Sequence, residues 1–189
     1  LTTMTHDYDR ISSHGVRGVL LEQQADALGL PLQKLFIKKG ASNAEYEAEL
    51  SKALKRHVQQ GVTMMVFGDI FLEDVKRYRE GLLSKAGLKG VFPLWKKDTR
   101  ELAVAFIDYG FKTIITAVDS NVLGKEFVGR EYNRTFLADL PKGVDPCGEN
   151  GEFHTFVYAG PNFNKPVLFT KGKEQLKENR FWYCDLVPN

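Results

Sequence analysis

The chain has 189 residues, enough for one domain, or one domain with a small appendage, around a sizeable core. Hydrophobic residues make up 43% and charged residues 26%, which excludes a disordered chain. No apolar run approaches the ~20 residues of a membrane-spanning helix, so no membrane partner is expected. The formal charge is only +2, and the basic residues are spread along the chain. That balance argues against a dedicated nucleic-acid-binding protein.

Cysteine is sparse, with only Cys147 and Cys184 in the sequence. Such usage is typical of a reducing compartment rather than of a disulfide-built scaffold. We therefore expect a cytoplasmic protein. Nothing in the sequence indicates an oligomeric state.

Strands and helices alternate through the first half of the chain. Residues 1–4 are typical of the end of a strand, and the spacing of Leu21, Ala25 and Leu28 predicts a helix that stops at Gly29. Apolar runs and amphipathic patterns then predict strand 32–37, helix 42–60, strand 62–67, helix 75–86, strand 89–92, helix 98–109 and strand 112–118. Ser42 with Glu45 has the form of a capping box. The segment from Asp98 to Glu101 is expected to cap the helix at 98–109.

This alternation is typical of βαβ units and predicts an α/β fold. We expect residues 1–119 to form a parallel sheet with helices on both faces, which binds ligands at the carboxyl ends of its strands. From about residue 120 the alternation ends. A helical segment near 133–140 precedes strands near 153–158, 166–170 and 180–187, and a charged run at 171–180 separates the last two. Residues 120–189 are therefore expected to form a small antiparallel α+β appendage.

A short turn before residue 155 concentrates polar chemistry. It holds two glycines, two glutamates, an amide and an imidazole: Gly148, Glu149, Asn150, Gly151, Glu152 and His154. Because glycine allows positive φ and close backbone approach, the polar side chains can point into one pocket. The alternative is an ordinary hairpin loop whose acids face water. The alternation of residues 153–158 favours a turn anchored at the edge of a core.

Asp69 follows Gly68 and a buried apolar run. Its carboxylate is therefore expected at the carboxyl end of the parallel sheet, where it could meet Mg²⁺ or a nucleotide. The alternative is an N-cap for the following helix.

Residues 12–17 place serines, His14 and Arg17 just before the first helix. A helix N-terminus with a nearby guanidinium suits a phosphate or a carboxylate. The alternative is an ordinary serine cap with a solvated Arg17.

Two weaker motifs also stay open. Pro93-Leu94-Trp95 could form an aromatic pocket wall, although tryptophan is more often a core residue. Cys147 with His154 could be a thiol nucleophile or part of a zinc site, but their spacing matches no standard zinc pattern. We predict no metal ligand set of the protein's own.

Four segments together resemble the diphthine–ammonia ligase family, adenine-nucleotide alpha hydrolase-like proteins of the PP-loop ATPase superfamily. They are Val66-Phe67-Gly68-Asp69-Ile70, Pro93-Leu94-Trp95, Ser13-His14-Gly15-Val16-Arg17 and the turn from Gly148 to Thr155. The resemblance runs through nearly the whole chain. It implies a Rossmann-like (HUP-type) sheet that binds ATP.

The resemblance also implies a reaction. ATP, used with Mg²⁺, is split between its α and β phosphates and activates a carboxylate as an acyl-adenylate, which ammonia attacks to give an amide, AMP and pyrophosphate. The named acceptor is diphthine, a modified histidine of translation elongation factor 2. The use of ATP agrees with elementary chemistry, because a carboxylate is a poor electrophile until it is adenylated. Mg²⁺ offsets the charge of the phosphates during this step.

The resemblance assigns roles to residues in three groups. The backbone of Thr3 and Met4 would contact adenine, and Gly68 and Asp69 would border the nucleotide or metal. The acceptor and ammonia pocket would be lined by Glu149, Asn150, Glu152 and His154. Either Glu149 or Glu152 would orient ammonia or accept its proton. His14 and Arg17 would orient phosphate or the acceptor carboxylate.

One family feature is missing. Members carry a pyrophosphate-binding loop of the form SGGxDS after the first strand, and this sequence contains no such motif. Its place would be upstream of Leu1, so we expect the natural protein to begin earlier and the chain alone to bind ATP poorly. Two further functions stay open: a related adenylating enzyme with another carboxylate, and a non-catalytic nucleotide-binding or partner-binding module.

Overall fold

A computed structural model describes the whole chain, residues 1–189, as three β-sheets with five α-helices. The strands are β1 Thr2–Thr5, β2 Arg10–Ile11, β3 Lys34–Ile37, β4 Met64–Val66, β5 Lys89–Val91, β6 Lys112–Asp119, β7 Phe153–Ala159, β8 Phe169–Lys177 and β9 Phe181–Pro188. The helices are α1 Gly18–Ala27, α2 Asn43–Gln59, α3 Glu73–Lys85, α4 Thr99–Asp108 and α5 Arg134–Asp139. Parallel and antiparallel pairs both occur, so the fold is a mixed α/β one.

The parallel strands form two separate sheets. The first has the order β2-β1-β3, with β1 parallel to β3 and antiparallel to the short β2. The second consists of β4 and β5, which are also parallel. A helix connects each parallel pair, α1 between β1 and β3 and α3 between β4 and β5. The predicted βαβ units are therefore confirmed for these two pairs.

Helix ends follow the predicted signals. Ser42 Oγ accepts from the backbone N of Glu45 at 3.3 Å, and Glu45 accepts in return from the backbone N of Ser42 at 2.8 Å. Asp98 caps α4 by accepting from the backbone N of Glu101 at 2.9 Å. The glycines after α1, α3 and α4 have the positive φ of a helix stop.

Strand β6 differs from the sequence prediction. It was expected in the parallel sheet, but it lies inside the antiparallel sheet β7-β6-β9-β8. Residues 113–119 are all buried. A strand covered on both faces has the same apolar pattern in either kind of sheet, so the pattern indicated burial but not direction. A strand of the predicted segment 1–119 thus pairs with strands of the segment 120–189.

Strand β8 also corrects the prediction. It continues to Lys177, through the charged run that was expected to separate two strands. Because β8 is an edge strand with exposed residues on both faces, it has no apolar alternation to reveal it. The β8–β9 hairpin turns at Glu178 and Asn179, which have φ of 54° and 51°.

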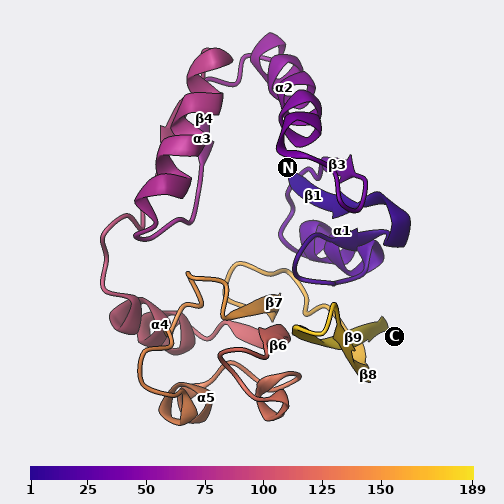
Figure 1. Cartoon of the computed structure of the whole chain (residues 1–189), viewed down its shortest axis with the longest axis vertical. Coiled ribbons are helices and arrows are strands. Elements are labelled where there is room, and N and C mark those ends of the chain that lie inside the picture. Colours follow the sequence, from indigo (N-terminus) through magenta and orange to yellow (C-terminus); the bar gives the residue numbers. More distant parts are fainter.

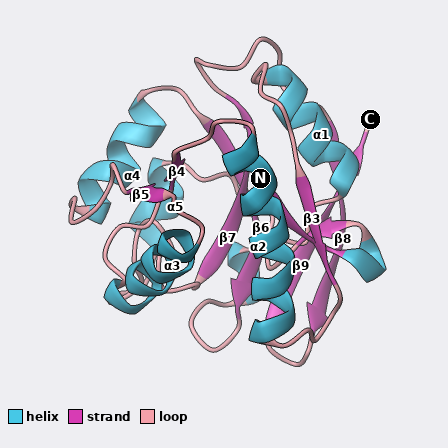
Figure 2. Cartoon of the chain, turned by 90° about the horizontal axis from the view of Figure 1, so that it is seen from above, coloured by secondary structure: helices cyan, strands magenta, loops and turns pink.

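Most of the core belongs to the antiparallel part. A cluster of 17 buried residues packs around β6, β7 and β9, with the fully buried Phe136 of α5 among them. The parallel part has a small cluster of Leu54, Leu83 and Leu88. Figure 1 shows α2 and α3 at one end of the molecule and the antiparallel sheet at the other. In the view from above, α3 and α4 lie on the opposite side of the strands from α1 (Figure 2).

Strand β4 was expected to be buried on both faces, but Met64 is 55% and Val66 68% exposed. It pairs only with β5. On its other side lies a cavity of about 400 Å³, which we call the split-sheet cavity. Leu1 and Thr3 line it beside β1, and Met65 to Phe67 line it beside β4. The cavity therefore lies between the two parallel sheets. No helix combines the length and apolar character that crossing a bilayer requires.

Candidate functional site

Two buried carboxylates hold the glycine turn before β7. Asp145 Oδ2 accepts from the backbone N of Cys147 at 3.2 Å and of Glu149 at 2.9 Å. Glu152 accepts from the backbone N of Asp145 at 3.0 Å, and from the backbone N and side-chain amide of Asn150 at 3.0 and 2.9 Å. The residues Asp145 and Glu152 are only 9% and 5% exposed. Because these oxygens satisfy donors that would otherwise be unpaired, they fix the shape of the turn.

This geometry excludes the ordinary loop with solvated acids. Glycine is required at Gly148, which has φ of 68° and where a Cβ atom would lie 2.9 Å from the carbonyl oxygen of Phe153. The sequence motif therefore specifies one backbone shape. Glu152 accepts three hydrogen bonds that hold this backbone shape. Glu149 is therefore the acid of the turn that is more available to a ligand.

Glu149 connects the turn to the parallel part of the fold. Its Oε1 accepts from the backbone N of Ile70 at 2.7 Å. Ile70 follows β4 and is buried, and its carbonyl accepts from the backbone N of Lys96 at 2.7 Å. The second carboxylate oxygen of Glu149 has no partner within the protein. The acidic turn therefore reaches the carboxyl-end side of β4, where ligands of α/β sheets bind.

Asp69 lies next to this contact. Its Oδ1 accepts from Nε of Arg79 at 3.1 Å, and the Arg79 guanidinium lies 4.7 Å from the centre of the Phe67 ring. The N-cap of α3 is Leu72, without a side-chain cap, so the alternative in which Asp69 caps this helix is wrong. Gly68 and Asp69 directly precede Ile70, the residue that Glu149 contacts.

His14 and His154 form a second group. Their ring centres are 4.7 Å apart, and His14 Nδ1 lies 3.1 Å from the carbonyl oxygen of Ser12. Burial lowers the pKa of His154 to about 4, with a further contribution from His14. Burial also lowers the pKa of His14, against an opposing effect of the Ser12 carbonyl. Both imidazoles are therefore neutral at neutral pH and can accept or donate a hydrogen bond.

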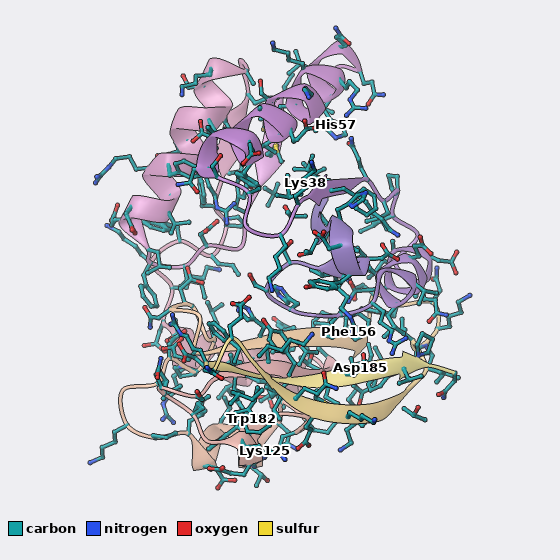
Figure 3. All side chains as sticks on the ribbon, turned by 45° about the vertical axis from the view of Figure 1, so that its right-hand side comes forward. Lys38, His57, Lys125, Phe156, Trp182 and Asp185 are labelled. Atoms are coloured by element: carbon teal, nitrogen blue, oxygen red, sulfur yellow. The ribbon has the colours of Figure 1, made fainter.

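Arg17 is held by an ion pair that the sequence did not reveal. Its Nε and Nη2 donate to the two carboxylate oxygens of Asp185 at 3.1 and 2.6 Å. Arg10 donates to the same carboxylate at 2.8 Å. Asp185 lies on β9, where Figure 3 labels it. Arg17 is itself the N-cap residue of α1, and no side chain caps this helix. The alternative of a serine cap with a solvated Arg17 is wrong.

We expect Asp185→Asn to lower the free energy of unfolding by about 2 kcal/mol at neutral pH. The two arginines, Arg17 first, lower the pKa of Asp185 from an ordinary 3.8 to about 2. A depressed folded-state pKa stabilises the fold above about pH 4, and this stabilisation is lost as pH falls through about 2. Urea unfolding at several pH values should therefore show the two proteins converging in acid.

Asp26→Asn is the matched control, because Asp26 pairs with Lys165 at 2.9 Å while 70% of its side chain is exposed. Its effect should stay below about 0.5 kcal/mol. An Asp185→Asn deficit that persists unchanged in acid would contradict the electrostatic origin of the effect.

Thr3 and Met4 lie on β1. Met4 is fully buried. The carbonyl of Thr3 accepts from the backbone N of Ser12 at 3.0 Å, and Thr3 lines the split-sheet cavity. Their role toward adenine stays a prediction.

The thiol of Cys147 is poorly suited to nucleophilic chemistry. Burial first, and then the nearby carboxylates of Asp145 and Glu149, raise its pKa to about 12. Its Sγ donates to the carbonyl of Thr99 at 3.2 Å. A thiol in this environment stays protonated, whereas nucleophilic cysteines need a lowered pKa.

Comparisons with known proteins find relatives over most of the chain. Residues 98–186 match the family model described as the diphthamide synthase C-terminal domain. A zebrafish (Danio rerio) protein named diphthine–ammonia ligase is 31% identical over 165 residues, which cover 76% of this chain and 62% of the relative. A mouse (Mus musculus) protein of the same name is 27% identical over 183 residues, covering 85% of this chain and 64% of the relative. The chain belongs to the diphthine–ammonia ligase family.

The chain spans less than two thirds of the length of these two relatives. A fission yeast (Schizosaccharomyces pombe) protein with the same name is longer, and the matched 111 residues cover only 18% of it at 27% identity.

In this member of the diphthine–ammonia ligase family, the region matched by the family model contains the acidic turn, His154 and Asp185. Gly68 and Asp69 lie outside that region. The sequence predicted Glu149 and, separately, Gly68 and Asp69 at the end of β4 as site residues. It gave no signal for Arg79 or Asp185. Asp145 had a weak signal, because an aspartate often accepts from the backbone N two residues later.

Proposed function

We propose that this chain is part of an ATP-dependent, amide-forming ligase. The enzyme adenylates a carboxylate for attack by ammonia and releases AMP and pyrophosphate. Family membership supports this reaction, and the relatives' name supports diphthine, on translation elongation factor 2, as the acceptor. The contact between Glu149 and Ile70 carries the proposal, because it sets a carboxylate of the turn beside Gly68 and Asp69 at the end of a parallel strand. A cytoplasmic enzyme suits the two free cysteines.

We also propose a Rossmann-like, HUP-type sheet in which the two parallel sheets are halves of a whole. Three observations support this. Both sheets are built from parallel pairs with helical crossovers, the split-sheet cavity separates β1 from β4, and apolar side chains of β4 are exposed at its border. An additional parallel strand with the SGGxDS loop would fill the gap and bury these side chains. Residues 1–119 then act as the nucleotide-binding unit and residues 120–189 as the substrate unit, with β6 joining them.

The residues fit the cofactors. Mg²⁺ in nucleotide sites needs only one or two protein carboxylates beside the phosphates and water. Asp69 keeps one carboxylate oxygen without a partner, which is enough for such a site, although no group of three or more possible metal ligands exists. Bound ATP with Mg²⁺ would supply the leaving group that a carboxylate lacks.

The chain's own residues would orient the other reactants. The free oxygen of Glu149 accepts a proton from ammonia as the new C–N bond forms. Neutral His154, beside His14, donates or accepts a hydrogen bond without adding charge. Glu152 and Asn150 keep the turn in the shape that aims Glu149. His14, which lies beside His154, would help to orient the acceptor. Arg17 is paired with Asp185, so it would support this region without contacting the acceptor itself.

The test is a pyrophosphate-release assay with ATP, Mg²⁺ and ammonium. We expect release with elongation factor 2 that carries diphthine, when the chain is joined to a family segment with the SGGxDS loop. The chain alone should release at least about 100-fold less, because the loop binds the pyrophosphate that leaves as the carboxylate is adenylated. Release only with free carboxylic acids would favour a related adenylating enzyme. The absence of release with every acceptor would favour a non-catalytic binding module.

A further inference from the structure

A second large cavity lies where the two halves of the chain meet. It has a volume of about 610 Å³ and is lined chiefly by Tyr8, Arg10, Lys39, His154, Lys177 and Tyr183. Tyr8 and Lys39 follow the carboxyl ends of β1 and β3, whereas Lys177 and Tyr183 belong to the β8–β9 hairpin. We call this the basic cavity. Its position at strand ends is typical of a ligand site rather than of a packing defect.

The charges around the basic cavity favour an anion. Arg10 pairs at 2.8 Å with the Asp185 carboxylate, which it shares with Arg17, and Lys39 pairs with Glu178 at 3.2 Å. Lys177 forms no salt bridge. Its Nζ lies instead 5.9 Å from the centre of the Tyr8 ring and 5.2 Å from that of Tyr183. One ammonium group is therefore available to a ligand.

The walls favour a flat ring. Tyr8, Tyr183 and the His154 imidazole all border the cavity. The Tyr183 ring packs against Gly15, where a Cβ atom would lie only 2.7 Å from the ring. Gly15 therefore lets the ring lie at the cavity wall. His154 adds a polar group that carries no charge at neutral pH, because burial lowers its pKa to about 4.

The backbone around the cavity is strained. Ser13 and Glu178 both line it, with φ of 63° and 54°. A non-glycine residue in this region costs on the order of 1 kcal/mol, and such residues cluster at functional sites. At Glu178 this φ belongs to the turn of the β8–β9 hairpin, so Ser13 is the strained position at the cavity wall.

We propose that the basic cavity binds the acceptor as a flat ring that carries a carboxylate, with Lys177 contacting the carboxylate and the Tyr8 and Tyr183 rings flanking the ring. The identity of the ligand as acceptor rests on the proposed ligase function. Binding itself does not, because it requires neither ATP nor turnover.

The experiment is an NMR titration of the 189-residue chain with imidazolepropionate, a flat ring that carries a carboxylate. We expect backbone amide shifts at Gly15 and in the hairpin, with saturation. Lys177→Met should weaken binding about tenfold, the size of one charge-assisted contact. Lys173→Met, the matched control on the same strand but outside the cavity, should change binding by less than about twofold. Tyr8→Leu should weaken binding, and Tyr8→Phe should not.

Comparison ligands distinguish the alternatives. Imidazole and propionate, which carry the ring and the anion separately, should each bind more weakly than imidazolepropionate. Tighter binding of inorganic phosphate at the same residues would overturn a carboxylate site, and equal effects of the two lysine variants would overturn the role of Lys177. If binding holds but the pyrophosphate assay fails, the cavity remains a carboxylate site and only the ligase function is lost. Thermal unfolding of each variant checks that the exposed substitutions leave the fold intact.

Discussion

Glu149→Gln should lower ammonia-dependent pyrophosphate release by at least about 100-fold, the lower end of what a general base contributes. The amide oxygen of glutamine can still accept from the backbone N of Ile70, a bond of 2.7 Å in the native protein. The turn should therefore stay docked beside β4. Glutamine cannot accept a proton from ammonia, so the chemical step is lost while the geometry is kept. The pyrophosphate-release assay on the loop-containing protein measures this effect.

Two measurements keep the result specific to the role of Glu149. The free energy of unfolding of the Glu149→Gln protein should differ from the native value by less than about 1 kcal/mol, because one hydrogen bond only changes from a charged to a neutral acceptor. Glu131→Gln is the matched control, since Glu131 accepts from the Tyr158 hydroxyl at 2.9 Å outside the turn. Turnover by Glu149→Gln equal to that of the control would remove Glu149 from the reaction.

Much of the candidate site could be predicted because it is encoded locally. Gly148, Glu149 and Glu152 lie within a few residues of one another, and glycine spacing gives a backbone shape. Partners far apart in the chain could not be predicted. Arg17 and Asp185 meet only because β9 passes near the start of α1, and sequence spacing contains no information about such a contact. The same holds for the basic cavity, whose lysines come from β8 and from the end of β3.

The fold shows a similar division. Capping residues and glycine stops act within one turn of helix, so Ser42 and Asp98 were placed correctly. The direction of β6 depends on which strands it meets, and its apolar pattern is the same for either direction. Strand β8 lacked a pattern altogether, because both of its faces contact solvent. Local signals therefore specified the elements, whereas pairing depended on contacts between distant segments.

Glu152→Gln should destabilise the protein by about 3 kcal/mol, more than a typical surface change. Both carboxylate oxygens of Glu152 accept hydrogen bonds, including one from the backbone N of Asn150 to Oε2 at 3.0 Å. A glutamine amide would place an N–H donor opposite one of these donors, and the residue is too buried for water to compensate. Urea unfolding measures the loss, with Glu49→Gln on α2 as an exposed control that should cost less than about 0.5 kcal/mol. The comparison of Glu152→Gln with Glu149→Gln separates the two acids. If Glu152 only shapes the turn, Glu149→Gln should lower release by the larger factor. Lost release from fully folded Glu152→Gln, together with unchanged release from Glu149→Gln, would instead make Glu152 the group that takes the proton, and Glu149 the one that docks the turn.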